Sequence, residues 1–380
     1  MPTTADAYRR NREGAAVRNK ATSLAGRDIG DIPPVRDFQR KVEGTSSLKR
    51  FCETYFPQTF TKPWSDDHIR VLAKLEQAIR HGGRRALAMP RGQGKTSICQ
   101  AGTLFGLLTG LRRFIMLVGA AEPHASHLLQ NLKAELLGND LLLEDFPESL
   151  YPIRCLENQA RRAIGQLHHG EPTHIQWGAD QIAMPMIPGS DAAGAVLRVA
   201  GLTGSLRGAL YTRPDGLPIR PDFALLDDPQ TDQSARSPSQ SATRERIISG
   251  AVLGLAGPGE QIAAIMPCTV VCPNDMADRM LNPELHPEWH GERTKLVYDF
   301  PDNEDLWDEY ADIRRECLRN NDNRASAATA FYREHREAMD AGAVVAWAAR
   351  KYPHELSALQ HAMNMKIDDE STFYAEFQND

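Results

Sequence analysis

The sequence predicts an α/β fold in which helices flank a mainly parallel sheet and a helical extension follows at the C-terminal end. Short apolar runs alternate with stretches of helical character in the order strand, helix, strand, helix, at residues 84–89, 97–108, 113–119 and 122–137. This alternation is typical of a parallel sheet covered by helices. The apolar runs are also continuous, as expected for strands that are buried on both faces.

The remaining elements follow from local signals. Ser65 is placed to cap a helix over residues 66–81, which has acids in its first turn and ends at Gly82-Gly83. A helix is expected over 47–56, and another opens at Ser237-Pro238 and runs to about 255. Further strands are expected at 181–184, 195–200, 223–226, 262–266 and 293–300, and the pattern turns helical from about residue 305.

Composition excludes several classes of protein. The chain has 380 residues, of which 41% are hydrophobic and 25% charged, which is ordinary for a soluble globular protein. No apolar run is long enough to span a membrane, and residues 1–27 lack the apolar segment of a secretory signal. The six cysteines form no C-x-x-C pair, so we expect reduced thiols in a cytosolic protein.

Charge gives little indication of a partner. The formal net charge is −6, which does not favour nucleic-acid binding by the chain as a whole. Residues 1–50 are locally basic, with eleven Lys and Arg against six Asp and Glu. We interpret residues 1–45 as a flexible, locally basic arm that is either solvated or able to touch DNA phosphates.

The loop after the first strand carries the clearest chemistry. It ends in Gly94-Lys95-Thr96 and opens a helix, the arrangement of a phosphate-binding loop (P-loop, Walker A). Its backbone can cradle phosphate oxygens, Lys95 can reach the β- and γ-phosphates of ATP, and Thr96 can hold Mg²⁺. The expected nucleotide-binding residues of the loop are Pro90, Arg91, Gly92, Gln93, Gly94, Lys95 and Thr96. The pattern G-x-x-x-x-G-K-[ST] has glycine where this chain has Met89.

Two acids follow the apolar run at residues 223–226, as in a Walker B motif. We expect this strand to lie beside the phosphate-loop strand and to present Asp227 and Asp228 at its carboxyl end. Asp227 would hold Mg²⁺, and Asp228 would orient or deprotonate the attacking water. The alternative is an Asp-Asp-Pro turn that only ends a strand.

Two further residues are candidates for catalysis. Thr269, at the tip of the next strand, can contact the γ-phosphate or the water, or it can be a solvent-facing turn residue. Arg91, inside the loop, can stabilise charge on the transferred phosphoryl group, or it can form an ion pair with a carboxylate at the sheet end.

Taken together, these motifs resemble the ATPase half of the large terminase subunit of tailed bacteriophages. The resemblance covers roughly residues 55–300 and rests on 89–96, 220–228 and 268–269 with 275–281 after them. In that family the first glycine of Walker A is often missing and an arginine precedes Gly-x-Gly-Lys, so Met89 and Arg91 match the family's variant. Leu202 to Gly208 resembles an Arg-Gly stretch upstream of Walker B, which makes Arg207 a second candidate arginine, directed toward a neighbouring subunit.

The resemblance implies a function and partners. Large terminases use ATP and Mg²⁺ to translocate double-stranded DNA into a procapsid, as rings on the portal protein, together with a small terminase subunit. The resemblance also implies that the segment before the first helix, which contains Trp64 and His68, contacts the base of the nucleotide. For these two residues, the alternatives are a core anchor and a structural histidine.

The family also carries a nuclease domain after the ATPase. Asp368, Asp369 and Glu370 are adjacent on a polar stretch and indicate an exposed acidic turn rather than a nuclease site. We therefore expect a P-loop ATPase core at 46–300 and, at 301–380, a mainly helical linker region leading toward a nuclease domain beyond residue 380. The alternative is a protein that lacks the nuclease domain.

The expected function is that of a Mg²⁺-dependent ATPase that packages viral DNA in the cytoplasm of a bacterial host. Two alternatives stay open: another P-loop DNA translocase or helicase, and a nucleotide-binding scaffold without turnover. A helicase would carry further coupling motifs, and a scaffold would lack a working carboxylate at Asp228.

Overall fold

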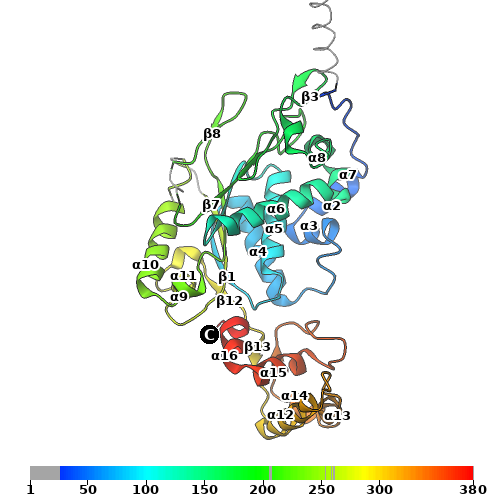
Figure 1. Ribbon diagram of the computed structural model, residues 1–380, viewed down its shortest axis with the longest axis vertical. Coiled ribbons are helices and arrows are strands. Elements are labelled where there is room, and N and C mark those ends of the chain that lie inside the picture. Colours follow the sequence, from blue (N-terminus) through cyan, green and yellow to red (C-terminus); the bar gives the residue numbers. More distant parts are fainter. Residues whose placement is uncertain (1–25, 205–207, 253, 258, 260–261, 380) are drawn as a thin grey trace, which may run out of the picture.

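The computed structural model describes residues 26–204, 208–252, 254–257, 259 and 262–379. A central eight-stranded sheet runs in the order β12-β1-β11-β10-β2-β7-β6-β5 (Figure 1). The strands from β12 to β7 are parallel, and β6 and β5 continue the sheet antiparallel. The predicted α/β class, with a mainly parallel sheet flanked by helices, is therefore confirmed.

The strands of this sheet match most of the predicted runs to within two residues. They are β1 (Gly83–Ala88), β2 (Phe114–Gly119), β5 (Gln176–Trp177), β6 (Gln181–Ala183), β7 (Val196–Gly201), β10 (Phe223–Asp227), β11 (Ala263–Cys268) and β12 (Glu292–Arg293). The run predicted at 293–300 is divided between β12 and β13 (Val297–Asp299). Its two parts join different sheets.

One prediction about strand order is wrong. The strand that ends in the paired acids, β10, does not lie beside β1, because β11 pairs in parallel with both and separates them. The register still aligns the carboxyl ends, since Ala88 of β1 lies opposite Cys268 of β11 and the backbone N–H of Asp228 donates to the carbonyl of Pro267 at 3.0 Å. Three strand ends, instead of two, meet at this edge of the sheet.

Helices cover both faces of the sheet. Alternate residues along each strand point to opposite faces, so Leu87 and Leu225 join one core cluster whereas Ala86 and Leu226 join the other. The helices of the first face are α3 (Leu48–Tyr55), α4 (Asp66–His81), α5 (Lys95–Leu108), α6 (Glu122–Gly138), α7 (Asp140–Asp145) and α8 (Pro147–Arg154). Those beside the second face are α9 (Asp232–Ala235), α10 (Pro238–Ile247) and α11 (Met276–Leu281).

Helix α4 shows how local sequence fixes an element. The Ser65 hydroxyl accepts from the backbone N–H of His68, and the imidazole of His68 accepts from the N–H of Ser65, so each side chain satisfies a donor at the helix start. Gly82 ends the helix with φ of 83°, a conformation that glycine adopts without strain. Both ends agree with the prediction. Helix α10 is shorter than predicted, because its helical hydrogen bonding changes to a π-helical turn at Ile248–Val252.

The segment predicted as an N-terminal arm includes α2 (Phe38–Thr45). Arg40 forms ion pairs with Glu144 and with the buried Asp145, and Lys41 pairs with Glu148. These contacts hold α2 against α7 and α8. Residues 1–25 lie outside the described residues.

Residues from about 300 onward build a second, mainly helical body, below the sheet in Figure 1. Its elements are α12 (Glu304–Arg319), α13 (Ser326–Glu334), α14 (Arg336–Asp340), the two-stranded β13–β14 pair with β14 at Val344–Val345, α15 (Ala358–Asp368), α16 (Glu370–Phe373) and a final π-helical turn (Tyr374–Gln378). Trp307, Tyr310 and Tyr332 form the centre of its own core. The mainly helical character predicted for this region agrees with the structure.

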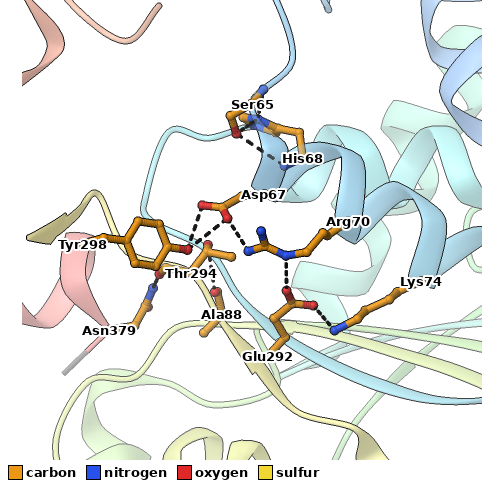
Figure 2. Close-up of polar contacts among 10 residues, drawn as sticks. All are labelled: Ser65, Asp67, His68, Arg70, Lys74, Ala88, Glu292, Thr294, Tyr298 and Asn379. Atoms are coloured by element: carbon orange, nitrogen blue, oxygen red, sulfur yellow. Dashed lines mark hydrogen bonds and ion pairs between the residues drawn. The ribbon is translucent and has the colours of Figure 1, made fainter. Parts of the chain in front are cut away.

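A polar network ties this body to the sheet domain (Figure 2). The Tyr298 hydroxyl donates to the buried carboxylate of Asp67 at 3.0 Å, and Arg70 pairs with both Asp67 and Glu292. Asn379 donates to the carbonyl of Thr294, whose N–H donates to the carbonyl of Ala88 at the end of β1. The segment that follows β12 therefore runs beside the first turns of α4, and the chain contacts this segment again at residue 379.

The remaining short elements pack on the sheet domain, where Ala163, Tyr211 and Trp289 belong to its core clusters. They are the hairpins β3 (Leu167–His168) with β4 (Glu171–Pro172) and β8 (Tyr211–Thr212) with β9 (Pro218–Ile219), and the 3-10 turns Ala160–Ala163 and Pro287–Trp289. Among the described helices, none combines the length and the apolar character that crossing a bilayer requires.

Candidate functional site

The glycine loop, residues 89–96, joins the end of β1 to the start of α5. Met89 is 2% exposed and packs in the core of the first face, so its side chain anchors the loop where the common pattern has glycine. Gly92 and Gly94 have φ of 79° and 78°, in the left-handed region, which explains why glycine stands at these two positions. The loop ends on the N-terminus of a 14-residue helix. The first N–H groups of such a helix have no intrahelical partner and favour an anion.

Lys95 is held by three oxygens at the carboxyl edge of the sheet. Its Nζ lies 2.9 Å from the carbonyl of Cys268, 3.0 Å from Oγ1 of Thr269 and 3.1 Å from Oδ1 of Asp228. The Thr269 hydroxyl also donates to Asp228 at 3.2 Å. Three residues predicted from separate sequence segments therefore form one cluster.

The two acids occupy different environments. Oδ1 of Asp227 is buried and has no hydrogen-bond partner. Burial, with the Asp228 carboxylate as a second cause, raises the pKa of Asp227 to about 6. The side chain of Asp228 is 48% exposed and borders the cavity beside the loop. Its φ of 39° is uncommon for a residue with a side chain, and it places the backbone at a sharp turn after β10.

Two residues that the sequence prediction left without a role hold the strand-end loop that contains Thr269. Gln230 donates to the carbonyl of Thr269 and to Asp275, both at 2.9 Å. The buried Asp275 also accepts from the backbone N–H of Val271 and caps α11 through Asp278 N–H. The N-cap position of Asp275 could be predicted from the sequence. Nothing in the sequence indicates that Gln230 contacts it.

A cavity of about 690 Å³ opens beside the loop. Lys95, Thr96, Asp228 and Thr269 line it together with Arg91. Its far wall is formed by C-terminal residues, namely Ser371, Thr372, Ala375 and Glu376. This C-terminal wall was not predicted.

Arg91 points its guanidinium at that wall. Its Nη1 lies 2.6 Å from the carboxylate of Glu376, and its backbone N–H donates to the carbonyl of the same residue at 2.9 Å. The Arg91 side chain is 72% exposed, and Glu376 is the main cause that raises its pKa. Of the two interpretations of Arg91, an ion pair is therefore present, although its partner lies on the C-terminal body and not at a strand end.

Trp64 and His68 line a second cavity, of about 230 Å³, on the other side of the loop. Nε2–H of His68 donates to the carbonyl of Gln93 at 3.0 Å, while Nδ1 accepts from Ser65. Burial lowers the pKa of His68. The indole N–H of Trp64 donates to Glu53 at 3.0 Å, and its ring packs against Phe60. Both residues are thus built into the fold and also face a cavity that borders the loop.

Two side chains near the sheet edge carry oxygens of the kind that magnesium prefers. Mg²⁺ is usually held by one or two carboxylates together with phosphate oxygens and water. Asp227 supplies a carboxylate oxygen without a partner, and Thr96 lies at the start of α5, on the lining of the larger cavity. Among the described residues, no group of three or more His, Cys, Asp or Glu is arranged to hold a metal by itself. A metal here would accordingly need further oxygen ligands from water or from a bound molecule.

The remaining predicted residues lie elsewhere. Arg207 is outside the described residues. Asp368 forms an ion pair with Arg314, and Asp369 caps α16, so the acidic run serves the ends of helices. Comparison of the chain with known family models and with curated proteins gives no match.

Proposed function

We propose that this chain is a P-loop NTPase that hydrolyses ATP with Mg²⁺. One observation carries the proposal: the Lys95 ammonium, the Asp228 carboxylate and the Thr269 hydroxyl meet within 3.2 Å of one another, beside the N-terminus of α5. Phosphoryl transfer requires positioning and charge neutralisation more than covalent chemistry, and these groups supply both.

Each residue receives a role. The loop N–H groups and Lys95 bind the phosphates, and Asp228 orients or deprotonates the attacking water. The Thr269 hydroxyl, which donates to the same carboxylate, contacts the γ-phosphate or the attacking water. Arg91 breaks its ion pair with Glu376 and then stabilises charge on the transferred phosphoryl group. Asp227 and Thr96 would hold Mg²⁺, which would supply positive charge to the phosphates. Trp64 and His68 lie against the base.

The DNA-packaging part of the proposal rests on the resemblance to large terminase subunits. It assigns double-stranded DNA as the substrate to be moved. It also assigns the portal protein and a small terminase subunit as partners, with the ATPases arranged as a ring, in the cytoplasm of a bacterial host. The variant loop, with Met89 and Arg91, is the feature that favours this branch over other P-loop translocases and helicases.

Phosphate release tests the proposal. The wild-type chain should release phosphate from ATP in the presence of Mg²⁺ and double-stranded DNA, and Asp228→Asn should bind ATP with turnover reduced by about 100-fold or more. Nucleotide binding without any turnover would instead support the alternative of a nucleotide-binding scaffold. Turnover that survives Lys95→Ala would place the reaction elsewhere.

A further inference from the structure

The smaller cavity contains a polar group that the proposed phosphate chemistry does not use. Gln93, in the middle of the glycine loop, is 2% exposed, and neither its Oε1 nor its Nε2 has a hydrogen-bond partner. Burying an amide without hydrogen-bond partners is unfavourable, because it loses its bonds to water. Its backbone carbonyl is bonded to His68, which fixes the residue at the cavity wall. A buried amide at a cavity wall is suited to a ligand that both donates and accepts hydrogen bonds.

Part of the lining of this cavity, Trp347 and Arg350, comes from the C-terminal body. The ring of Trp347 lies 4.7 Å from that of His68, edge to face, and its indole N–H donates to the carbonyl of Pro63 at 2.7 Å. The ammonium of Lys62 lies over the same ring, 5.5 Å from its centre. Trp64 and Trp347 both line the cavity, and aromatic side chains suit a planar ring ligand.

Arg350 fastens this part of the lining to the glycine loop. Its Nη2 donates to the carbonyl of Arg91 at 2.6 Å, and its guanidinium lies over the ring of Phe377, 5.3 Å from the centre. Its Nη1 is buried and has no partner. The glycine loop, which borders the larger cavity, is therefore hydrogen-bonded to the same segment that carries Trp347.

We propose that Trp347 and Gln93 complete a base subsite in this cavity, with Trp347 as a stacking wall and the Gln93 carboxamide as the group that selects adenine. This inference rests on the proposed function, because it places the base of the nucleotide whose phosphates bind at Lys95. It gives the Gln93 side chain a role in base selection and adds Trp347, outside the sheet domain, as a residue that contributes to affinity.

The carboxamide distinguishes the two purines. Adenine presents an N6–H donor beside the N7 acceptor, which matches the acceptor and donor of a glutamine side chain. Guanine presents two acceptors at the same edge, O6 and N7, so one of them would face the Gln93 oxygen.

Calorimetric titration of the full chain with ADP, GDP and pyrophosphate, each with Mg²⁺, tests the proposal. The wild type should bind ADP at least about fivefold more tightly than GDP. Gln93→Leu should bring that ratio close to one, and Gln93→Glu, which keeps the shape but loses the donor, should lower it as well. Trp347→Ala should weaken ADP and GDP about equally, by roughly tenfold, with partial rescue in Trp347→Phe.

Pyrophosphate separates this inference from the proposed function. It should bind equally to the wild type, the Trp347 variants and the control Tyr352→Ala, which changes an exposed aromatic on the same segment. Unchanged ADP selectivity in both Gln93 variants, or unchanged ADP affinity in Trp347→Ala, overturns the inference while pyrophosphate binding leaves the ATPase proposal standing. Pyrophosphate binding that is insensitive to Lys95→Ala would instead remove the proposed function.

Discussion

The ammonium of Lys95 and the carboxylate of Asp228 are bonded to each other, with Nζ 3.1 Å from Oδ1. The Lys95 side chain is 12% exposed and that of Asp228 is 48% exposed, so the pair sits at the mouth of the larger cavity with its carboxylate facing outward. The two groups that we assign to phosphate and to water thus position one another.

Replacement of Lys95 should abolish the reaction without unfolding the protein. Lys95→Ala removes the cation for the β- and γ-phosphates, and it also leaves Asp228 without its ion-pair partner. We expect phosphate release to fall by at least about 100-fold, with a change in unfolding free energy of about 1 kcal/mol or less, because Asp228 is half-exposed. Phosphate release and urea unfolding measure the two effects. Lys366→Ala, which alters a lysine paired within α15 and α16, is the matched control and should change neither.

Thr269 should act on turnover more than on binding. Its hydroxyl joins Lys95 to Asp228, so Thr269→Ala removes a bond that aligns the proposed base. We expect kcat to fall about 10-fold to 100-fold with KM changed less than about threefold. Thr269→Ser keeps the hydroxyl and should restore most of kcat. Equal losses in the Ala and Ser variants would show that the methyl group, and not the hydroxyl, is what the site needs.

Substitutions of Arg91 and Glu376 should have opposite effects on the kinetics of ATP hydrolysis. In our proposal Arg91 leaves Glu376 to meet the phosphoryl group, so breaking this exposed pair is a cost of binding. Exposed ion pairs contribute about 0–1 kcal/mol, and Glu376→Ala should therefore lower KM for ATP by up to about fivefold. Arg91→Ala should lower kcat by about 100-fold or more. Steady-state kinetics of both single variants and of the double variant measure this. A Glu376→Ala enzyme as slow as Arg91→Ala would mean that the pair itself is needed for the reaction.

Local signals explain which parts of this structure the sequence could predict. The limits of α4 follow from Ser65 and Gly82, and the glycine loop follows from residues next to one another in the chain. The insertion of β11 between β1 and β10 depends on pairing Gly83 with Ala263, which no local pattern encodes. The same holds for the C-terminal wall: Glu376 and Trp347 are unremarkable in sequence, and they border the two cavities only because the second body folds back on the loop.

The buried carboxylate of Glu355 should make the stability of the second body depend on pH. Glu355 is 4% exposed and accepts from His361 at 2.8 Å, from Asn364 at 2.9 Å and from the backbone N–H of Tyr352 at 2.7 Å. Burial alone would raise its pKa, but these hydrogen bonds outweigh burial, so the pKa of Glu355 lies below its usual 4.5. A depressed folded-state pKa gives stability that is present above pH 4.5 and lost as the pH falls through the folded value.

Glu355→Gln should therefore be destabilising by about 1–3 kcal/mol at pH 7, because the amide cannot accept all three bonds as a carboxylate does. The difference from the wild type should shrink as the pH is lowered below about 4, since the wild-type carboxyl then becomes neutral too. Urea unfolding of both proteins across this range measures the difference, with the exposed Glu334→Gln as the control that should match the wild type throughout. A difference that stays constant from pH 7 to pH 3.5 would mean that the shape of the side chain, and not its charge, holds residues 352–364 together.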